Sequence, residues 1–222
     1  MSAAQPGARG PHTVSDVMTH TVVAVGRDAP FKEIVQTMEQ WKVSALPVLE
    51  GEGRVVGVVS EADLLHKEEF RDSDPSRGEQ RQRLADLAKA GALTAGELMS
   101  SPAVCVHADA ALAQAARIMA VRHVKRLPVV DAEGLLQGVV SRSDLLKVFL
   151  RSEEELAAEV HGEVVDRLFP GQDVAVAVDE GVVTLTGKVR DGSLIPVAAR
   201  LVRAVEGVVD VRWETPPDAP QT

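Results

Sequence analysis

Apolar residues recur along this chain at two spacings, and these spacings predict where helices and strands lie. In the first group, the residues are three or four positions apart, a spacing that places their side chains on one face of a helix. The group consists of Phe31, Ile34, Val35 and Met38. Short apolar runs bounded by turn residues predict strands at 22–25, 46–49 and 55–59. Another helix is predicted to begin at Ser60, so the order of this unit is β-α-β-β-α.

The same pattern occurs a second time within the first 150 residues. Leu-Pro-Val followed by Gly-Val-Val-Ser-x-x-Asp-Leu-Leu occurs within 46–65 and again within 127–146. A constant offset relates the identical pairs Met18 and Met99, Met38 and Met119, Gly57 and Gly138, Ser60 and Ser141, and Asp63 and Asp144. A register of this length without gaps indicates an internal duplication. We therefore predict a second β-α-β-β-α unit, whose last helix runs from 141 toward 150.

A third unit has a different order. Apolar residues at every fourth position predict a helix face formed by Leu156, Val160, Val164 and Leu168. Strands are predicted at 174–178, 182–189 and 208–213, with a helix over 193–205 that ends at Gly207. The resulting order, α-β-β-α-β, does not repeat the earlier units and indicates a separate domain.

These patterns predict an α+β protein with three folded parts. The predicted boundaries are a disordered N-terminus at 1–13, the first unit at 14–66, a charged connector at 67–93, the second unit at 94–150, the third unit at 151–215 and a disordered tail at 216–222. The connector is predicted to contain a helix over 79–90. A solvated linker is the favoured interpretation of this segment, with a partner-binding helix as the alternative.

Charge and composition restrict the range of possible functions. The net charge is −9, and from Arg151 onward 7 Lys and Arg face 14 Asp and Glu. This acid excess, together with the absence of Tyr, argues against binding to nucleic acid or anionic lipid. The single cysteine, Cys105, excludes an internal disulfide and fits a reducing cytoplasm. No apolar run approaches the roughly 18 residues of a membrane span, so we expect a cytoplasmic protein.

The duplicated motif resembles the cystathionine-β-synthase (CBS) domain family. The resemblance rests on Val-Met-Thr near the start, the Met at the helix centre, Leu-Pro-Val, and Gly-x-x-Ser-x-x-Asp-Leu-Leu. It implies that the two copies pair about a pseudo-twofold axis into a module with two clefts, and that two such modules form a homodimer. It also implies a ligand in those clefts, namely AMP, ADP, ATP or an adenosyl compound such as S-adenosylmethionine.

The third unit resembles the BON domain family. The matching motifs are Val-Asp-Glu-Gly-Val-Val-Thr-Leu-Thr-Gly-Lys-Val at 178–189 and Val-Glu-Gly-Val-Val-Asp-Val at 205–211. The resemblance implies contact with phospholipid or with another macromolecule. Because the unit is acidic, we expect a protein partner rather than a lipid.

The repeated Ser-x-x-Asp motif admits two interpretations. In one, Ser60 with Asp63 and Ser141 with Asp144 form capping boxes at helix starts. In the other, which the CBS resemblance implies, the aspartate accepts hydrogen bonds from ribose and the serine contacts ribose or phosphate. A helix start also suits an anion. We favour the second interpretation, because a capping box usually carries Glu or Gln.

Differences between the copies favour the second one as the phosphate site. The second copy carries the basic residues His123, Lys125, Arg126 and Arg142, where the first has Lys42, Ser44, Ala45 and Glu61. Such cations suit a phosphate chain, although 125 and 126 could reach the neighbouring cleft or form an exposed basic edge. The base pocket implied by the resemblance is formed by Val22 and Val23 or by Ala103 and Val104, residues that would otherwise be strand core.

No feature of the sequence indicates catalysis. There is no nucleophile–base pair, no metal-ligand spacing and no Gly-rich phosphate loop followed by Lys. Cys105 aligns with Ala24, which predicts an inert core thiol. We therefore predict a non-enzymatic sensor that needs no cofactor or metal, and that binds an adenine nucleotide and signals through its BON domain. The alternatives are a ligand-free dimerisation scaffold that presents the BON domain to protein or lipid, a nucleotide hydrolase, and a nucleic-acid binder.

Overall fold

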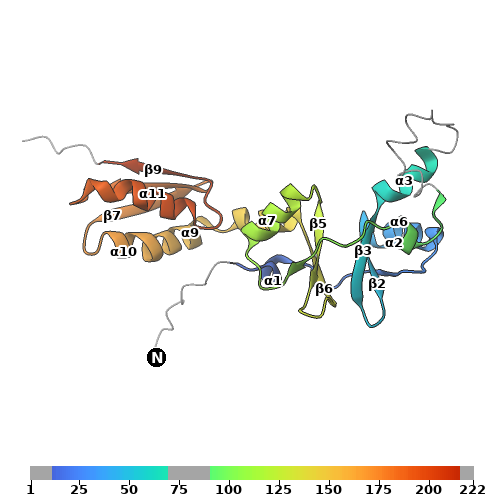
Figure 1. Cartoon of the computed structure of the whole chain (residues 1–222). Coiled ribbons are helices and arrows are strands. Elements are labelled where there is room, and N and C mark those ends of the chain that lie inside the picture. The colour runs from blue at the N-terminus through green and yellow to red at the C-terminus, as the bar shows by residue number, and fades with distance from the viewer. Residues whose placement is uncertain (1–11, 70–90, 216–222) are drawn as a thin grey trace, which may run out of the picture. The chain divides into compact units, whose positions relative to one another are not determined.

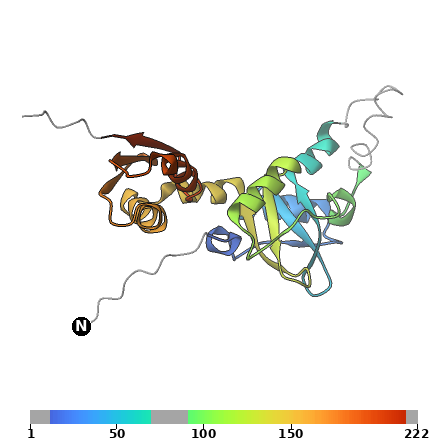
Figure 2. The same ribbon diagram turned by 60° about the vertical axis from the view of Figure 1, so that its left-hand side comes forward.

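The computed structural model describes residues 12–69 and 91–215. Within them the chain divides into two compact units (Figures 1 and 2). The first contains 13–142, and the second contains 12 and 143–215. The predicted disordered tail at 216–222, all but the last two residues of the predicted disordered start, and most of the connector with its helix lie outside the described residues.

The first unit contains both copies of the repeat. The first copy consists of α1 (Val14–Val17), β1 (Val25–Gly26), α2 (Phe31–Trp41), β2 (Ala45–Glu50), β3 (Arg54–Ser60) and α3 (Glu61–Glu69). The second consists of α6 (Ala95–Leu98), β4 (Val106–His107), α7 (Leu112–Val121), β5 (Arg126–Val130), β6 (Leu136–Ser141) and the start of α8 (Arg142–Leu145). Each copy has a three-stranded sheet with one parallel and one antiparallel pair. This confirms the α+β class and the two β-α-β-β-α repeats.

Each repeat buries one face of its helix against its sheet. In α2, Ile34 and Met38 are buried as the spacing predicts, whereas Val35, which the spacing also places on this face, is exposed. They pack with Leu46 and Val59 of the sheet, which have no exposed surface. The burial of this stripe follows the spacing of three and four residues, because only one face of a surface helix contacts the core.

The two short opening helices are exchanged between the copies. Val14 at the start of α1 donates a backbone hydrogen bond to Ala110 in the second copy (2.9 Å), and Ala95 at the start of α6 donates one to Ala29 in the first (2.9 Å). Leu98 of α6 is buried in the core of the first copy. The sequence pattern did not reveal these helices, although both carry a capping box, Thr-x-x-Asp in α1 and Thr-x-x-Glu in α6.

The contacts between the copies are reciprocal. The bridge between Thr19 and Val139 has its counterpart, at the equivalent positions of the repeat, in the bridge between Ser100 and Val58. A third bridge joins Arg54 to Leu135, two positions that are themselves equivalent in the two copies. Exchanging the copies therefore leaves the set of contacts unchanged, which is the property of a pseudo-twofold pair. The hairpins β2–β3 and β5–β6 lie side by side in both views (Figures 1 and 2).

Two predicted elements of the repeats differ from the structure. The first strand covers only 25–26 rather than 22–25, because its ladder to β2 contains only the pairs of Val25 with Val48 and Gly26 with Leu49. The helix predicted from 141 toward 150 is α-helical over α8 only. It continues as a tighter 3-10 turn at Leu146–Leu150, a common way for a helix to end.

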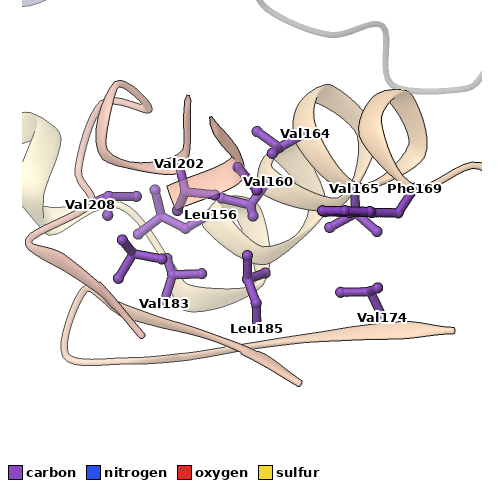
Figure 3. Packing of buried hydrophobic residues seen from close by; sticks show 12 residues of the cluster. Leu156, Val160, Val164, Val165, Phe169, Val174, Val183, Leu185, Val202 and Val208 are labelled. Atoms are coloured by element: carbon purple, nitrogen blue, oxygen red, sulfur yellow. The ribbon is translucent and has the colours of Figure 1, made fainter. Parts of the chain in front are cut away.

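The second unit has the predicted order α-β-β-α-β. Its helical part comprises α9 (Glu153–Val160), a π-helical turn (His161–Val165) and α10 (Asp166–Leu168). The rest comprises β7 (Val174–Asp179), β8 (Val182–Gly187), a 3-10 turn (Gly192–Leu194), α11 (Ile195–Arg203) and β9 (Asp210–Glu214). The sheet order is β7-β8-β9, with β7 antiparallel and β9 parallel to β8. One core lies between the helices and the sheet (Figure 3).

The π-helical turn changes which residues of this helix are buried. A π turn contains an extra residue relative to an α turn and rotates the side chains that follow it. Leu156, Val160 and Val164 are buried as predicted. At the end of the turn and after it, Val165 and Phe169 are buried (Figure 3). Leu168 is only partly buried and packs against this core.

Gly207 does not end α11 directly, because that helix stops at Arg203. It lies in the following turn with φ of +95°, a conformation that glycine adopts without strain. A Cβ atom there would lie 2.6 Å from the carbonyl oxygen of Val148. Close backbone packing therefore accounts for this glycine.

Candidate functional site

A cavity of about 320 Å³ lies in the first unit and is lined by both copies of the repeat. One wall is the junction between β3 and α3, where Ser60 and Asp63 lie. The other copy contributes the segment that contains Ala103 and Val104 and precedes β4. Because each wall comes from a different copy, the cavity depends on how the two copies pair.

Asp63 is buried in the wall of this cavity, with 8% of its surface exposed. Its Oδ2 atom accepts hydrogen bonds from the Ser60 backbone N–H at 2.8 Å and from the Ser60 hydroxyl at 2.7 Å. These bonds are those of a capping residue at a helix start. The capping interpretation therefore describes the local geometry, and Asp63 is at the same time one of the residues that line the cavity.

The wall formed by the second copy is mainly apolar. Ala103 and Val104 are half-buried and line the cavity together with Pro102. Apolar side chains in the lining of a cavity suit contact with an aromatic ring system. Cys105 follows them and is half-buried rather than fully buried as predicted. Burial raises the pKa of its thiol.

Three basic side chains of the second copy also line the cavity. These are His123, Lys125 and Arg126, at the turn after α7 and the start of β5. The Arg126 Nη2 atom donates a hydrogen bond to the hydroxyl of Ser44 at 2.8 Å, which connects the two copies. Within residues 12–69 and 91–215, no hydrogen bond or ion pair engages the Lys125 ammonium group. The cavity therefore presents two permanent cations to a ligand.

The structure brings together seven of the residues predicted from the sequence. They are Ser60, Asp63, Ala103, Val104, His123, Lys125 and Arg126. The basic residues of the second copy thus lie with Asp63 of the first, whereas the sequence analysis had favoured a site in the second copy, whose aspartate is Asp144. Asp144 belongs to the other unit, where its Oδ1 atom accepts a hydrogen bond from Lys147 at 2.7 Å.

The remaining predicted residues do not line this cavity. Val22, Val23, Ser141 and Arg142 are the counterparts, in the other copy, of Ala103, Val104, Ser60 and Glu61. Sequence reasoning did not select Ser44 and Glu61 as site residues, although both line the cavity. Their signal was present, because they occupy the positions of Lys125 and Arg142 in the other copy.

Two other kinds of site were sought in the described part of the chain. Among residues 12–69 and 91–215, no three His, Cys, Asp or Glu side chains come together as metal ligands. In the same ranges, no helix has the length and apolar character needed to cross a membrane.

Comparison with known proteins identifies both parts of the chain. The CBS domain model matches residues 14–69 and 95–151, and the BON domain model matches 152–214. Uncharacterized protein MJ1426 of Methanocaldococcus jannaschii is 28% identical over 153 residues, covering 62% of this chain and 90% of that protein. The chloroplastic CBS domain-containing protein CBSX2 of Arabidopsis thaliana is 28% identical over 163 residues, covering 68% of each.

A solved structure agrees with the sequence matches. The crystal structure of CBSX2 in complex with AMP covers 63% of this chain and 97% of its own, with a TM-score of 0.56 and 30% identity. The duplicated motif, the reciprocal contacts between the copies and these matches lead to one conclusion. The chain belongs to the CBS domain family, and its tandem CBS pair is followed by a BON domain.

Proposed function

We propose that the CBS pair binds an adenine nucleotide in the cavity between its two copies. One observation carries the proposal: a buried carboxylate, an apolar wall and two cations converge on a single cavity. Asp63 accepts hydrogen bonds from the ribose hydroxyls, and Ala103 and Val104 contact the base. Lys125 and Arg126 bind the phosphate, since ammonium and guanidinium groups both donate to phosphate oxygens.

The contribution of each contact to the binding free energy depends on whether the contacting group is charged. A hydrogen bond to a charged group contributes about 1.5–3 kcal/mol, so the Asp63 carboxylate has a large effect on ribose binding. The cation contacts at the partly open side are weaker because solvent screens them. Support also comes from CBSX2, which was crystallised with AMP.

The nucleotide acts here as a signal rather than as a substrate. The Ser60 hydroxyl, which lines the cavity, donates to Asp63 as part of the helix cap, and this carboxylate is the group that we assign to the ribose. A ligand that binds one arrangement of the CBS pair better than another shifts the population toward that arrangement. The BON domain passes this change to a protein partner, which fits its acidic charge.

Calorimetric titration of the full chain with AMP, ADP, ATP and S-adenosylmethionine tests the proposal. Asp63→Asn removes the charge and keeps an oxygen that can accept from Ser60, so we expect it to fold and to lose about tenfold to hundredfold in affinity. Lys125→Ala should also weaken binding. The matched control is Asp144→Asn, the same change at the counterpart position, which should leave the affinity within about twofold. Saturable binding that survives Asp63→Asn unchanged, or no binding by any of the four compounds, would contradict the proposal.

A further inference from the structure

A second hollow adjoins the cavity on the side of α2. It shares Ser44, Glu61 and Arg126 with the cavity, so these three residues form the border between the two. A phosphate held by Lys125 and Arg126 lies beside this border. A longer phosphate chain that extends past Arg126 enters the second hollow.

The second hollow is poorly suited to additional negative charge. Beyond Arg126 it is lined by the carboxylates Glu61 and Glu39 and by one further cation, Lys42. Lys42 forms an ion pair with Glu39. A hydrogen bond from the Lys42 ammonium group and the charge of that group lower the pKa of the Glu39 carboxyl. The charge of Lys42 is thereby compensated, whereas no ion pair within 12–69 and 91–215 compensates Glu61 at the border.

The two copies of the repeat differ in charge at the position of Glu61. Glu61 directly follows the serine of the Ser-x-x-Asp motif, and the corresponding residue of the second copy is Arg142. The two copies thus place opposite charges at equivalent positions. A cation here would assist a polyphosphate, whereas a carboxylate opposes it.

We propose that Glu61 is the residue that restricts this cavity to nucleotides with a single phosphate. The inference rests on the proposed nucleotide binding and specifies the ligand class of that site. The single phosphate of a monophosphate stays on Lys125 and Arg126, whereas the outer phosphates of a triphosphate are repelled by Glu61 at the border. Because Glu61 is exposed, each unit of charge at this position changes the relative affinity by about two- to fivefold.

The experiment compares AMP with ATP, without divalent cations and at low ionic strength, on the full chain. Wild type should bind AMP more tightly than ATP. The ratio of the two affinities should fall about threefold in Glu61→Gln and about tenfold in Glu61→Arg. Glu52→Arg makes the same charge change in the exposed turn between β2 and β3, outside both hollows, and should not alter the ratio.

The outcomes separate this inference from the proposed function. If AMP and ATP bind but their ratio is the same in wild type and Glu61→Arg, or if wild type prefers ATP, the role of Glu61 is refuted and nucleotide binding stands. An equal change in Glu52→Arg would show a nonspecific charge effect and would also refute it. If neither nucleotide binds to any variant, both proposals fail. A circular dichroism spectrum of each variant verifies that it is folded.

Discussion

Gly138→Ala tests the reciprocal packing of the two repeats. An ideal Cβ atom at Gly138 would lie 2.9 Å from the backbone oxygen of Thr19 and 2.8 Å from the sulfur of Met18. The Thr19 oxygen cannot move aside freely, because it accepts a hydrogen bond from Val139 N–H at 3.0 Å. Overpacking of this kind costs about 1–3 kcal/mol. Loss of glycine entropy in the unfolded chain offsets about 0.4–1 kcal/mol, so we expect a net loss of about 1–2 kcal/mol.

The assay is urea unfolding followed by tryptophan fluorescence. The chain has two tryptophans, Trp41 in the CBS unit and Trp213 in the BON domain. A Trp213→Phe background therefore leaves a signal from the CBS unit only. Gly138→Ala should lower the urea midpoint in this background without changing the slope of the transition.

Two other glycine variants make this test specific. Gly26→Ala should be neutral or slightly stabilising, because no atom lies within 4 Å of its added Cβ. Gly57 is the counterpart of Gly138, and the three atoms nearest to its added Cβ are the sulfur, Cγ and Cβ of Met99. Because the Met99 Cβ is fixed to the backbone, Gly57→Ala should also destabilise the CBS unit and serves as the reciprocal comparison. A Gly138→Ala protein as stable as wild type would refute the close contact between the repeats.

Three further predictions concern single side chains. Phe169→Ala should reduce the stability of the BON domain by about 3–5 kcal/mol, because Phe169 is 1% exposed in its core, and unfolding monitored by Trp213 fluorescence measures the loss. Backbone N–H groups of Leu93 and Thr94 lower the pKa of the Glu97 carboxyl. The stability that Glu97 contributes is thus present above its ordinary pKa and is lost as the pH falls through the lowered value, so the difference between wild type and Glu97→Gln in urea unfolding should shrink from pH 6 to pH 3. Because burial raises the pKa of Cys105, its thiol should react with Ellman's reagent at pH 8 more slowly than free cysteine does.

The sequence alone was sufficient for the orders β-α-β-β-α and α-β-β-α-β and for the members of the duplicated motif, but not for the short helices α1 and α6. The spacing of Ile34 and Met38 predicted the buried face of α2, because burial follows helical periodicity when one face meets a sheet. The constant offset between the copies predicted that Ser60 and Asp63 act together, and the structure shows them hydrogen-bonded.

Features that depend on packing between the repeats were not predictable from local patterns. The exchange of α1 and α6 leaves no periodic signal, since each helix has only four residues. Lys125 and Arg126 face the cleft that contains Asp63, and only the pairing of the two copies decides this. The π turn at 161–165 was hidden for another reason. Apolar residues at every fourth position are compatible with both an α-helix and a π turn. The two differ only in the direction of the side chains that follow the turn, which the sequence does not show.

The most direct test of the account is a crystal structure of the full chain grown with AMP. The account predicts the ribose at Asp63, the base against Ala103 and Val104, and the phosphate within hydrogen-bond distance of Lys125 and Arg126. AMP bound elsewhere, or no ligand density in this cavity from crystals grown at a saturating AMP concentration, would contradict the account.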